Sequence, residues 1–192
     1  MYLGLDLGTS GIKALLIDDR QAVVGSGHGA LDVSRPHHGW SEQEPAEWVR
    51  ACREAIADLR AAHAREFAAI KGIGLSGQMH GATLLDAADA VLRPCILWND
   101  TRSFVEAAKL DADPRFRKLT GNIVFPGFTA PKLAWVKANE PALFAKVAKV
   151  LLPKDYLRFW LTGEHISEMS DSAGTAWLDV EKRCWSPELL AA

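Results

Sequence analysis

The sequence predicts an α/β domain that begins with an antiparallel meander of three strands. Two apolar runs, Tyr2–Leu7 and Ile12–Ile17, are separated only by the turn-forming residues Gly8-Thr9-Ser10-Gly11, which is typical of a β-hairpin. Residues 21–31, rich in Val and Gly, provide the third strand. Helical and strand-like segments then alternate, as in a mixed sheet flanked by helices. A Rossmann domain would instead begin with a βαβ unit.

The first long helix is expected to begin at Pro45, which suits the first helical position, after a polar loop over residues 34–44. Its inward face is predicted from side chains that recur at steps of three or four: Trp48, Cys52, Ile56, Leu59 and His63. Strands are then expected over 71–76 and 82–86, around a polar corner at 77–81. A further strand is expected over 91–98, where Pro94 indicates an edge or a bulge.

The second half of the chain is predicted to be mainly helical. The expected helices span residues 102–110, 131–138, 141–147 and 153–162. Residues 167–175 are expected to form a loop of small residues, followed by a short apolar piece over 176–180. Thr129 or Ala130 is expected to cap the helix that Pro131 begins. Lys132 is expected to be solvated in the first turn of that helix, with a side chain that reaches the cleft as the alternative.

Composition and charge exclude several classes of protein. The 192 residues are 48% hydrophobic and 24% charged, with a net charge of −2, which is ordinary for a soluble globular domain. The 22 basic and 24 acidic residues leave no electrostatic footprint for nucleic acid. No segment has the roughly 20 apolar residues of a membrane helix, and the N-terminus does not have the pattern of a secretory signal. We therefore expect a cytoplasmic protein.

The cysteines and histidines give no metal or disulfide pattern. Cys52, Cys95 and Cys184 lie far apart, so we interpret them as small buried side chains in a reducing compartment. The adjacent pair His37-His38 would point to opposite faces of an extended segment, which is poor geometry for one ion.

One glycine pattern, Gly72-Ile73-Gly74-Leu75-Ser76-Gly77, formally matches the dinucleotide fingerprint. That fingerprint needs a strand before it and a helix after it. Here the glycines lie within a predicted strand and another strand follows, so we interpret the match as accidental.

The first hairpin carries residues suited to phosphate and magnesium. Asp6 closes its first strand, small residues form the turn, and Lys13 lies near the start of the second strand. Glycines let the backbone approach closely, and turn N–H groups with the Thr9 and Ser10 hydroxyls can donate to phosphate oxygens. Asp6 could hold Mg²⁺ through water. An ordinary glycine-rich turn with a surface lysine is the alternative.

Polar triplets close two other strands and suggest a site for a polyol. They are Gln78-Met79-His80 and Trp98-Asn99-Asp100. Amide, imidazole and carboxylate groups can bond several hydroxyls, while Met79 and Trp98 offer apolar faces to the C–H side of a sugar. Each triplet alone is also compatible with turn chemistry beside a core.

Together these segments resemble the FGGY family of carbohydrate kinases, over essentially the whole chain. The segments that carry the resemblance are Asp6–Gly11, Trp40–Gln43, Gly77–Gly81, Ile96–Asp100, Gly127–Trp135, Leu152–Leu157 and Ser170–Thr175. The Gly-Gln-Met-His-Gly corner is similar to that of the members that phosphorylate xylulose, and glycerol kinases differ there. Ala138 departs from the family's preference for a polar residue, which we interpret as a surface change.

The resemblance implies an actin-like ATPase domain of ribonuclease H type and a phosphotransferase with an alcohol acceptor. It implies transfer of the γ-phosphoryl group of ATP, with Mg²⁺, to the 5-hydroxyl of D-xylulose. Met79 and His80 would contact the sugar, and Gln78, Trp98, Asn99 and Asp100 would border its pocket. Gly8, Thr9, Ser10 and Lys13 would line the phosphate path, with Asp6 serving the magnesium. No nucleic acid or membrane partner is implied, and the parent protein is expected to be a homodimer.

The resemblance also implies that residues 1–192 form an N-terminal domain only. Family members are more than twice as long, and their general base, an aspartate in a Gly-Gly-x-Asp-Asn segment, lies in a second domain. No such segment occurs here, so we expect the isolated chain to be nearly inactive. Two alternatives stay open: another sugar substrate, such as ribulose, gluconate or a deoxy sugar, or a non-catalytic module that binds a sugar or nucleotide.

Overall fold

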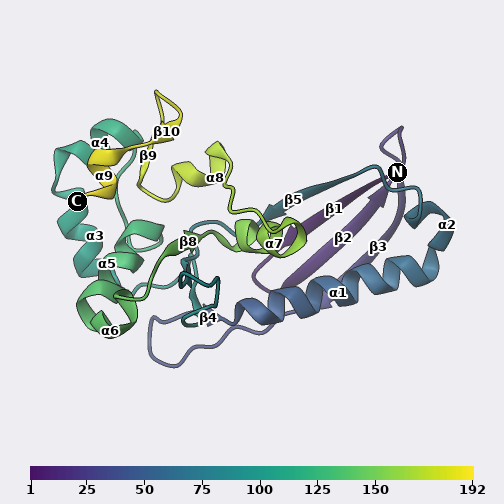
Figure 1. Ribbon diagram of the computed structural model, residues 1–192, viewed down its shortest axis with the longest axis horizontal. Coiled ribbons are helices and arrows are strands. Elements are labelled where there is room, and N and C mark those ends of the chain that lie inside the picture. The colour runs from purple at the N-terminus through teal and green to yellow at the C-terminus, as the bar shows by residue number, and fades with distance from the viewer.

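The structure is a computed structural model that describes residues 1–192. A four-stranded mixed sheet forms its largest regular part. Its strand order is β3-β2-β1-β5 (Figure 1). The predicted meander is formed by β1 (Tyr2–Leu7), β2 (Gly11–Ile17) and β3 (Val23–Ala30), which pair antiparallel. β5 (Gly72–Gly77) pairs parallel with β1. The predicted α/β class with a mixed sheet is therefore confirmed.

One face of this sheet is covered by the long helix α1 (Pro45–Ala62), which runs along it in Figure 1. The sequence alternates in β1 and β2, so every second side chain points to this helix. Gly27 and Gly29 allow the close approach: a Cβ at either would meet the backbone oxygen of Ala55 at 2.0 Å or of Ala51 at 2.1 Å. The buried residues of this layer include Leu3, Leu5, Leu7, Ile12, Ala14, Leu16, Trp48, Cys52 and Leu59.

Most of the remaining elements lie to the left of the four-stranded sheet in Figure 1. Helix α7 (Pro153–Thr162) lies between them and the sheet. The short strand pairs are β4 (Glu42–Gln43) with β7 (Cys95–Ile96), β6 (Thr83–Leu85) with β8 (Lys149–Leu151), and β9 (Leu178–Asp179) with β10 (Cys184–Trp185). The helices are α2 (Ala64–Phe67), α3 (Phe104–Asp111), α4 (Pro114–Thr120), α5 (Thr129–Asn139), α6 (Pro141–Phe144), α7 (Pro153–Thr162), α8 (Met169–Ala173) and α9 (Pro187–Leu190). None of the helices combines the length and apolar character needed to cross a bilayer.

Three expected segments are wrong in type or extent. The helix expected over 141–147 ends at Phe144. The strand expected over 91–98 shrinks to β7, because Pro94 cannot donate to a ladder; Val91 makes only an isolated bridge to Leu85. The loop expected over 167–175 contains α8, whose first turn is capped by the Glu168 carboxylate accepting two backbone N–H groups.

Helix boundaries and one cysteine also differ from expectation. α5 begins at Thr129 and is preceded by Phe128 in extended conformation, so neither Thr129 nor Ala130 is the cap. Cys52 and Cys95 are buried as expected, but Cys184 is exposed. The unpredicted helix α4 does carry sequence signals, an Asp113 cap before a proline and a left-handed Gly121 after its last residue.

Candidate functional site

The predicted phosphate hairpin and the predicted sugar corner meet at one edge of the four-stranded sheet. β1 and β5 are parallel, and Asp6 lies opposite Ser76 near the carboxyl ends of both strands. The Ser76 hydroxyl donates to Asp6 Oδ1 at 2.8 Å. Lys13 lies opposite Asp6 on β2, and both side chains are exposed. A carboxylate, a hydroxyl and an ammonium group therefore share this edge of the sheet.

The turn between β1 and β2 leaves two backbone donors free. Gly8 N donates to Gly11 O at 2.9 Å, which closes the turn, whereas the N–H groups of Thr9 and Ser10 donate no hydrogen bond within the chain. Adjacent free N–H groups are a common way to bind phosphate. Gly11 is required for another reason: a Cβ there would lie 2.7 Å from the Gly29 oxygen of β3.

A partly buried chain of hydrogen bonds joins this turn to Gln78. The Thr9 hydroxyl donates to Gln78 Oε1 at 3.1 Å, and Gln78 Nε2 donates to Gln43 Oε1 at 2.9 Å. Gln43 Nε2 returns to the Thr9 carbonyl at 2.7 Å, while Gln43 Oε1 also accepts from Trp48 Nε1 at 3.0 Å. Both the oxygen and the nitrogen of the Gln78 side-chain amide are thus hydrogen-bonded, and Gln78 connects the turn to the sugar corner at Met79 and His80.

Trp98 extends this connection to the second predicted triplet. Its Nε1 donates to the Thr9 hydroxyl at 3.0 Å, although Trp98 lies 89 residues further along the chain. Its side chain is nevertheless exposed, as is that of Met79. Two apolar side chains therefore face solvent beside the turn, where they are available to a ligand.

Asp100 differs from its neighbours because it is buried and fully bonded. Its Oδ2 accepts from Ser41 N and from Arg102 Nη2, both at 2.6 Å, and its Oδ1 accepts from Arg102 N and Nε at 2.9 Å. Arg102 also pairs with Glu42 at 2.7 Å and stacks on Trp40. Asn99, in contrast, is exposed. Asp100 thus anchors the turn that carries Trp98 and Asn99.

His80 is held in an unusual conformation in an aromatic surrounding. Its backbone φ is 65°, in the left-handed region, and its ring lies 4.8 Å from the Phe128 ring and 6.1 Å from the Phe125 ring. Burial, and then the nearby charge of Lys132, lowers the pKa of His80 to about 4 from 6.5. His80 is therefore a neutral imidazole at physiological pH.

Lys132 is not the solvated side chain that the sequence suggested. It is completely buried, and its ammonium group donates to the carbonyl oxygen of His80 at 3.0 Å and to that of Gly127. Burial lowers the pKa of Lys132 to about 7. Its place in the first turn of a helix gave no sign of this, because the partners are carbonyl groups from distant segments.

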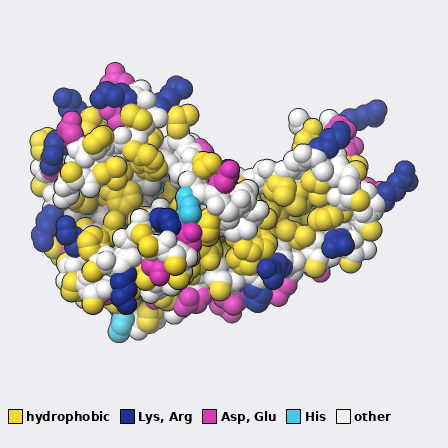
Figure 2. Space-filling view, in the orientation of Figure 1, with side chains coloured by type: hydrophobic (Ala, Val, Ile, Leu, Met, Phe, Trp, Pro, Cys, Tyr) yellow, Lys and Arg dark blue, Asp and Glu magenta, His cyan; other side chains and the backbone are white.

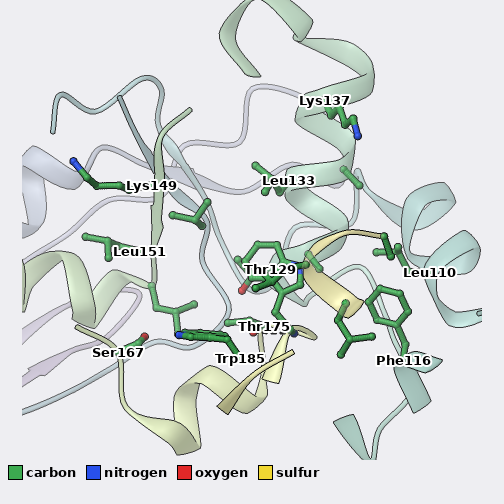
Figure 3. Close-up of a pocket in the computed structure, with 18 of the residues that line it drawn as sticks. Leu110, Phe116, Thr129, Leu133, Lys137, Lys149, Leu151, Ser167, Thr175 and Trp185 are labelled. Atoms are coloured by element: carbon green, nitrogen blue, oxygen red, sulfur yellow. Dashed lines mark hydrogen bonds between the residues drawn. The ribbon is translucent and has the colours of Figure 1, made fainter. Parts of the chain in front are cut away.

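A separate cavity adjoins this region through Thr129, which lines it and donates to the His80 carbonyl. It has a volume of about 510 Å³ and is lined mainly by apolar side chains of α5, β8 and the C-terminal segment. Figure 3 shows Thr129 and Thr175 near its centre, with Lys137 and Lys149 at its periphery. Figure 2 shows hydrophobic side chains gathered on that part of the surface. None of the predicted site residues lines it, and such a lining is poorly suited to a polyhydroxy ligand.

The structure thus brings most predicted site residues together and adds others. Thr9, Gln78 and Trp98 are joined directly by hydrogen bonds. Asp6 lies at the same sheet edge, opposite Ser76, and its carboxylate is bonded to Ser76 alone. Sequence reasoning assigned no role to Gln43, although it lies in a segment that carries the family resemblance. Ala138 is exposed, as the sequence indicated.

Comparisons with known proteins cover the whole chain. A family model described as "FGGY family of carbohydrate kinases, N-terminal domain" matches residues 1–192. The chain is 53% identical to the xylulose kinase of Escherichia coli and 55% identical to that of Klebsiella pneumoniae, in each case over 100% of this chain and 40% of the relative. A crystal structure of a "xyloylose kinase" from Brucella ovis is 76% identical, with a TM-score of 0.98, over 99% of this chain and 40% of that one.

Proposed function

The chain belongs to the FGGY family of carbohydrate kinases, whose members have the actin-like ATPase fold, and from this we propose a function for the longer protein that contains it. That protein transfers the γ-phosphoryl group of ATP to the 5-hydroxyl of D-xylulose, and residues 1–192 are its N-terminal domain. The chain spans about 40% of the length of the curated relatives it matches. A second domain then supplies the general base, and the isolated chain is nearly inactive.

The observation that carries this proposal is the link from the corner at Met79 and His80 to the hairpin. Thr9 accepts from Trp98 and donates to Gln78, the residue that precedes Met79. A sugar held against Met79, His80 and the exposed ring of Trp98 would lie beside the free N–H groups of the turn. Phosphoryl transfer depends on such positioning of acceptor and phosphate.

The residues of the hairpin suit the phosphate side of the reaction. The N–H groups of Thr9 and Ser10 can donate to phosphate oxygens, the glycine at position 8 leaves the turn open, and Lys13 supplies positive charge. His80 is neutral, so its imidazole can donate to or accept from a sugar hydroxyl without competing ion pairs.

Carbohydrate kinases of this family use ATP with a divalent metal. The residues here fit Mg²⁺: Asp6 is an exposed carboxylate with a hydroxyl partner, and no group of three or more His, Cys, Asp or Glu side chains could enclose an ion. A single carboxylate suits Mg²⁺ that keeps water and phosphate oxygens as its other ligands. Bound there, the ion would neutralise developing charge on the phosphates.

A second sugar is the alternative that a comparison supports. A gluconate kinase from Lactobacillus acidophilus is 27% identical to this chain, with a TM-score of 0.91. The relatives named as xylulose kinases reach 53% and 55% identity, which favours the ketopentose.

The test is a kinase assay of the full-length protein with D-xylulose, D-ribulose and D-gluconate. We expect D-xylulose to give the highest kcat/KM, and His80→Ala to lower it about 10- to 100-fold. His38→Ala is the matched control, since His38 is an exposed histidine in the polar loop. A higher kcat/KM for another sugar would transfer the proposal to that sugar. Turnover by residues 1–192 alone at the full-length rate would contradict the assignment of a second domain.

A further inference from the structure

A buried ammonium group lies directly behind the proposed sugar corner. Lys132 belongs to the first turn of α5 and is 0% exposed, and its ammonium group donates to carbonyl oxygens rather than to a carboxylate. Its bonds go to two carbonyl oxygens, those of His80 at 3.0 Å and Gly127. Those residues lie 52 and 5 positions away in the sequence, so one side chain connects two separate segments.

Apart from these two hydrogen bonds, the surroundings of Lys132 destabilise its charged form. Burial lowers its pKa to about 7, against 10.5 for an ordinary lysine, and the positive end of a helix dipole disfavours a cation in the first turn. An apolar side chain of similar volume would avoid both costs. The presence of a lysine at this position therefore indicates that a hydrogen-bond donor is needed there.

The Lys132 ammonium group holds the backbone carbonyl of His80. A non-glycine residue in the left-handed region is strained and persists only when its surroundings fix it. Two donors fix this carbonyl: Lys132 Nζ, and the Thr129 hydroxyl at 3.1 Å, from the same helix turn. On the ring side, Gly174 leaves the necessary space, because a Cβ there would lie 2.2 Å from His80 Cε1.

The second hydrogen bond of Lys132, to the Gly127 carbonyl, holds the segment whose aromatic side chain packs against His80. Gly127 directly precedes Phe128, whose ring lies 4.8 Å from the His80 ring. The ammonium group thus ties the backbone of His80 to the segment that packs against its side chain.

We propose that Lys132 is a positioning residue for His80: with Thr129 it clamps the His80 carbonyl and sets where the imidazole meets the substrate. This rests on the proposed function insofar as His80 contacts the sugar. The clamp itself is a statement about the geometry of His80, and it can be measured without turnover.

The experiment compares three variants of the full-length protein: Lys132→Met, Thr129→Val and Thr120→Val. The first two remove one donor each from the His80 carbonyl at nearly constant volume. Thr120→Val is the matched control, because Thr120 is also a buried helical threonine that donates to a backbone carbonyl, that of Phe116 at 2.8 Å. Melting temperatures establish that each variant is folded under assay conditions.

We expect Lys132→Met to raise the KM for the sugar about tenfold and Thr129→Val about threefold. The KM for ATP stays unchanged in both, which a general loss of stability would not produce. The ¹³Cε1–¹H signal of His80 at neutral pH, assigned by its absence in His80→Ala, shifts in both variants because the ring moves relative to Phe125 and Phe128. Thr120→Val changes neither quantity.

A folded Lys132→Met protein with an unchanged His80 signal would overturn the proposal, whatever its KM. If Lys132→Met does not fold, Thr129→Val decides by the same two measurements, since it is neutral and isosteric. If the wild-type protein phosphorylates no sugar, the proposed function fails, and the His80 signal alone still decides whether the clamp exists.

Discussion

Replacing Asp100 by asparagine tests whether this residue stabilises the fold through its buried contacts. The carboxylate accepts four hydrogen bonds, three from Arg102 and one from Ser41 N, at 2.6 to 2.9 Å. Asn keeps the shape but has one acceptor oxygen, so its NH₂ group would face donors. Arg102 is itself buried, and Glu42 would be its one remaining ion-pair partner.

The expected cost follows from these contacts. Two hydrogen bonds that involve a charged group are lost, at about 1.5–3 kcal/mol each, and breaking a buried ion pair by removing one partner costs about 3–5 kcal/mol. These two estimates describe the same change, so we expect about 3–5 kcal/mol in total. For a domain of this size that corresponds to a fall in Tm of roughly 6–20 °C.

The chain provides a matched control at the surface. Asp113 and Arg115 have the same spacing of two residues, and Asp113 also accepts the arginine's backbone N–H and guanidinium, but this pair is exposed. Asp113→Asn keeps a good helix cap, so we expect little change in Tm. Differential scanning calorimetry of the full-length protein measures both variants. If Asp100→Asn and Asp113→Asn lower the Tm equally, burial is not what makes the Asp100 contacts important.

Three further outcomes are expected. Gly29→Ala places a methyl group 2.1 Å from the Ala51 oxygen, so overpacking should cost at least about 1–3 kcal/mol in chemical denaturation; an unchanged midpoint would contradict this packing. The pKa of His80 is about 4 when folded and 6.5 when unfolded, so the unfolded state binds more protons between these values and the Tm should fall as the pH is lowered through this range, less steeply in His80→Ala. Trp98→Phe keeps an aromatic face but removes the indole donor to Thr9, and should raise the KM for the sugar about threefold; loss of activity without a change in KM would point to another role.

Much of the fold could be predicted because its elements carry local signals. The hairpin of β1 and β2 has strong apolar alternation around a turn of small residues, and α7 has the bounds that Pro153 and Gly163 indicate. Other segments depend on distant partners. β8 is only three residues long and exists because β6 pairs with it, and periodicity within one segment contains no information about such a pairing.

For the candidate site, the sequence indicated which residues are polar at strand ends but could not separate the exposed ones from the buried ones. Gln78 and Asp100 stand beside Met79 and Trp98 in the two triplets, yet the first two are buried and bonded while the last two face solvent. Lys132 was expected to be exposed to solvent but is buried. Burial is decided by packing between segments, which spacing along the chain does not specify.

This separation has a consequence for catalysis. A buried polar side chain with all its bonds made restricts the residues beside it to one arrangement. Gln78 does so for the Thr9 turn, Asp100 for Trp98, and Lys132 for His80. Substitution of a buried residue should therefore change the stability of the fold and the geometry of its partner together. Substitution of the partner that faces the proposed ligand should change ligand affinity and should lower the Tm less than substitution of the buried residue. Measuring Tm and KM on both members of each pair distinguishes these roles without a bound ligand in the structure.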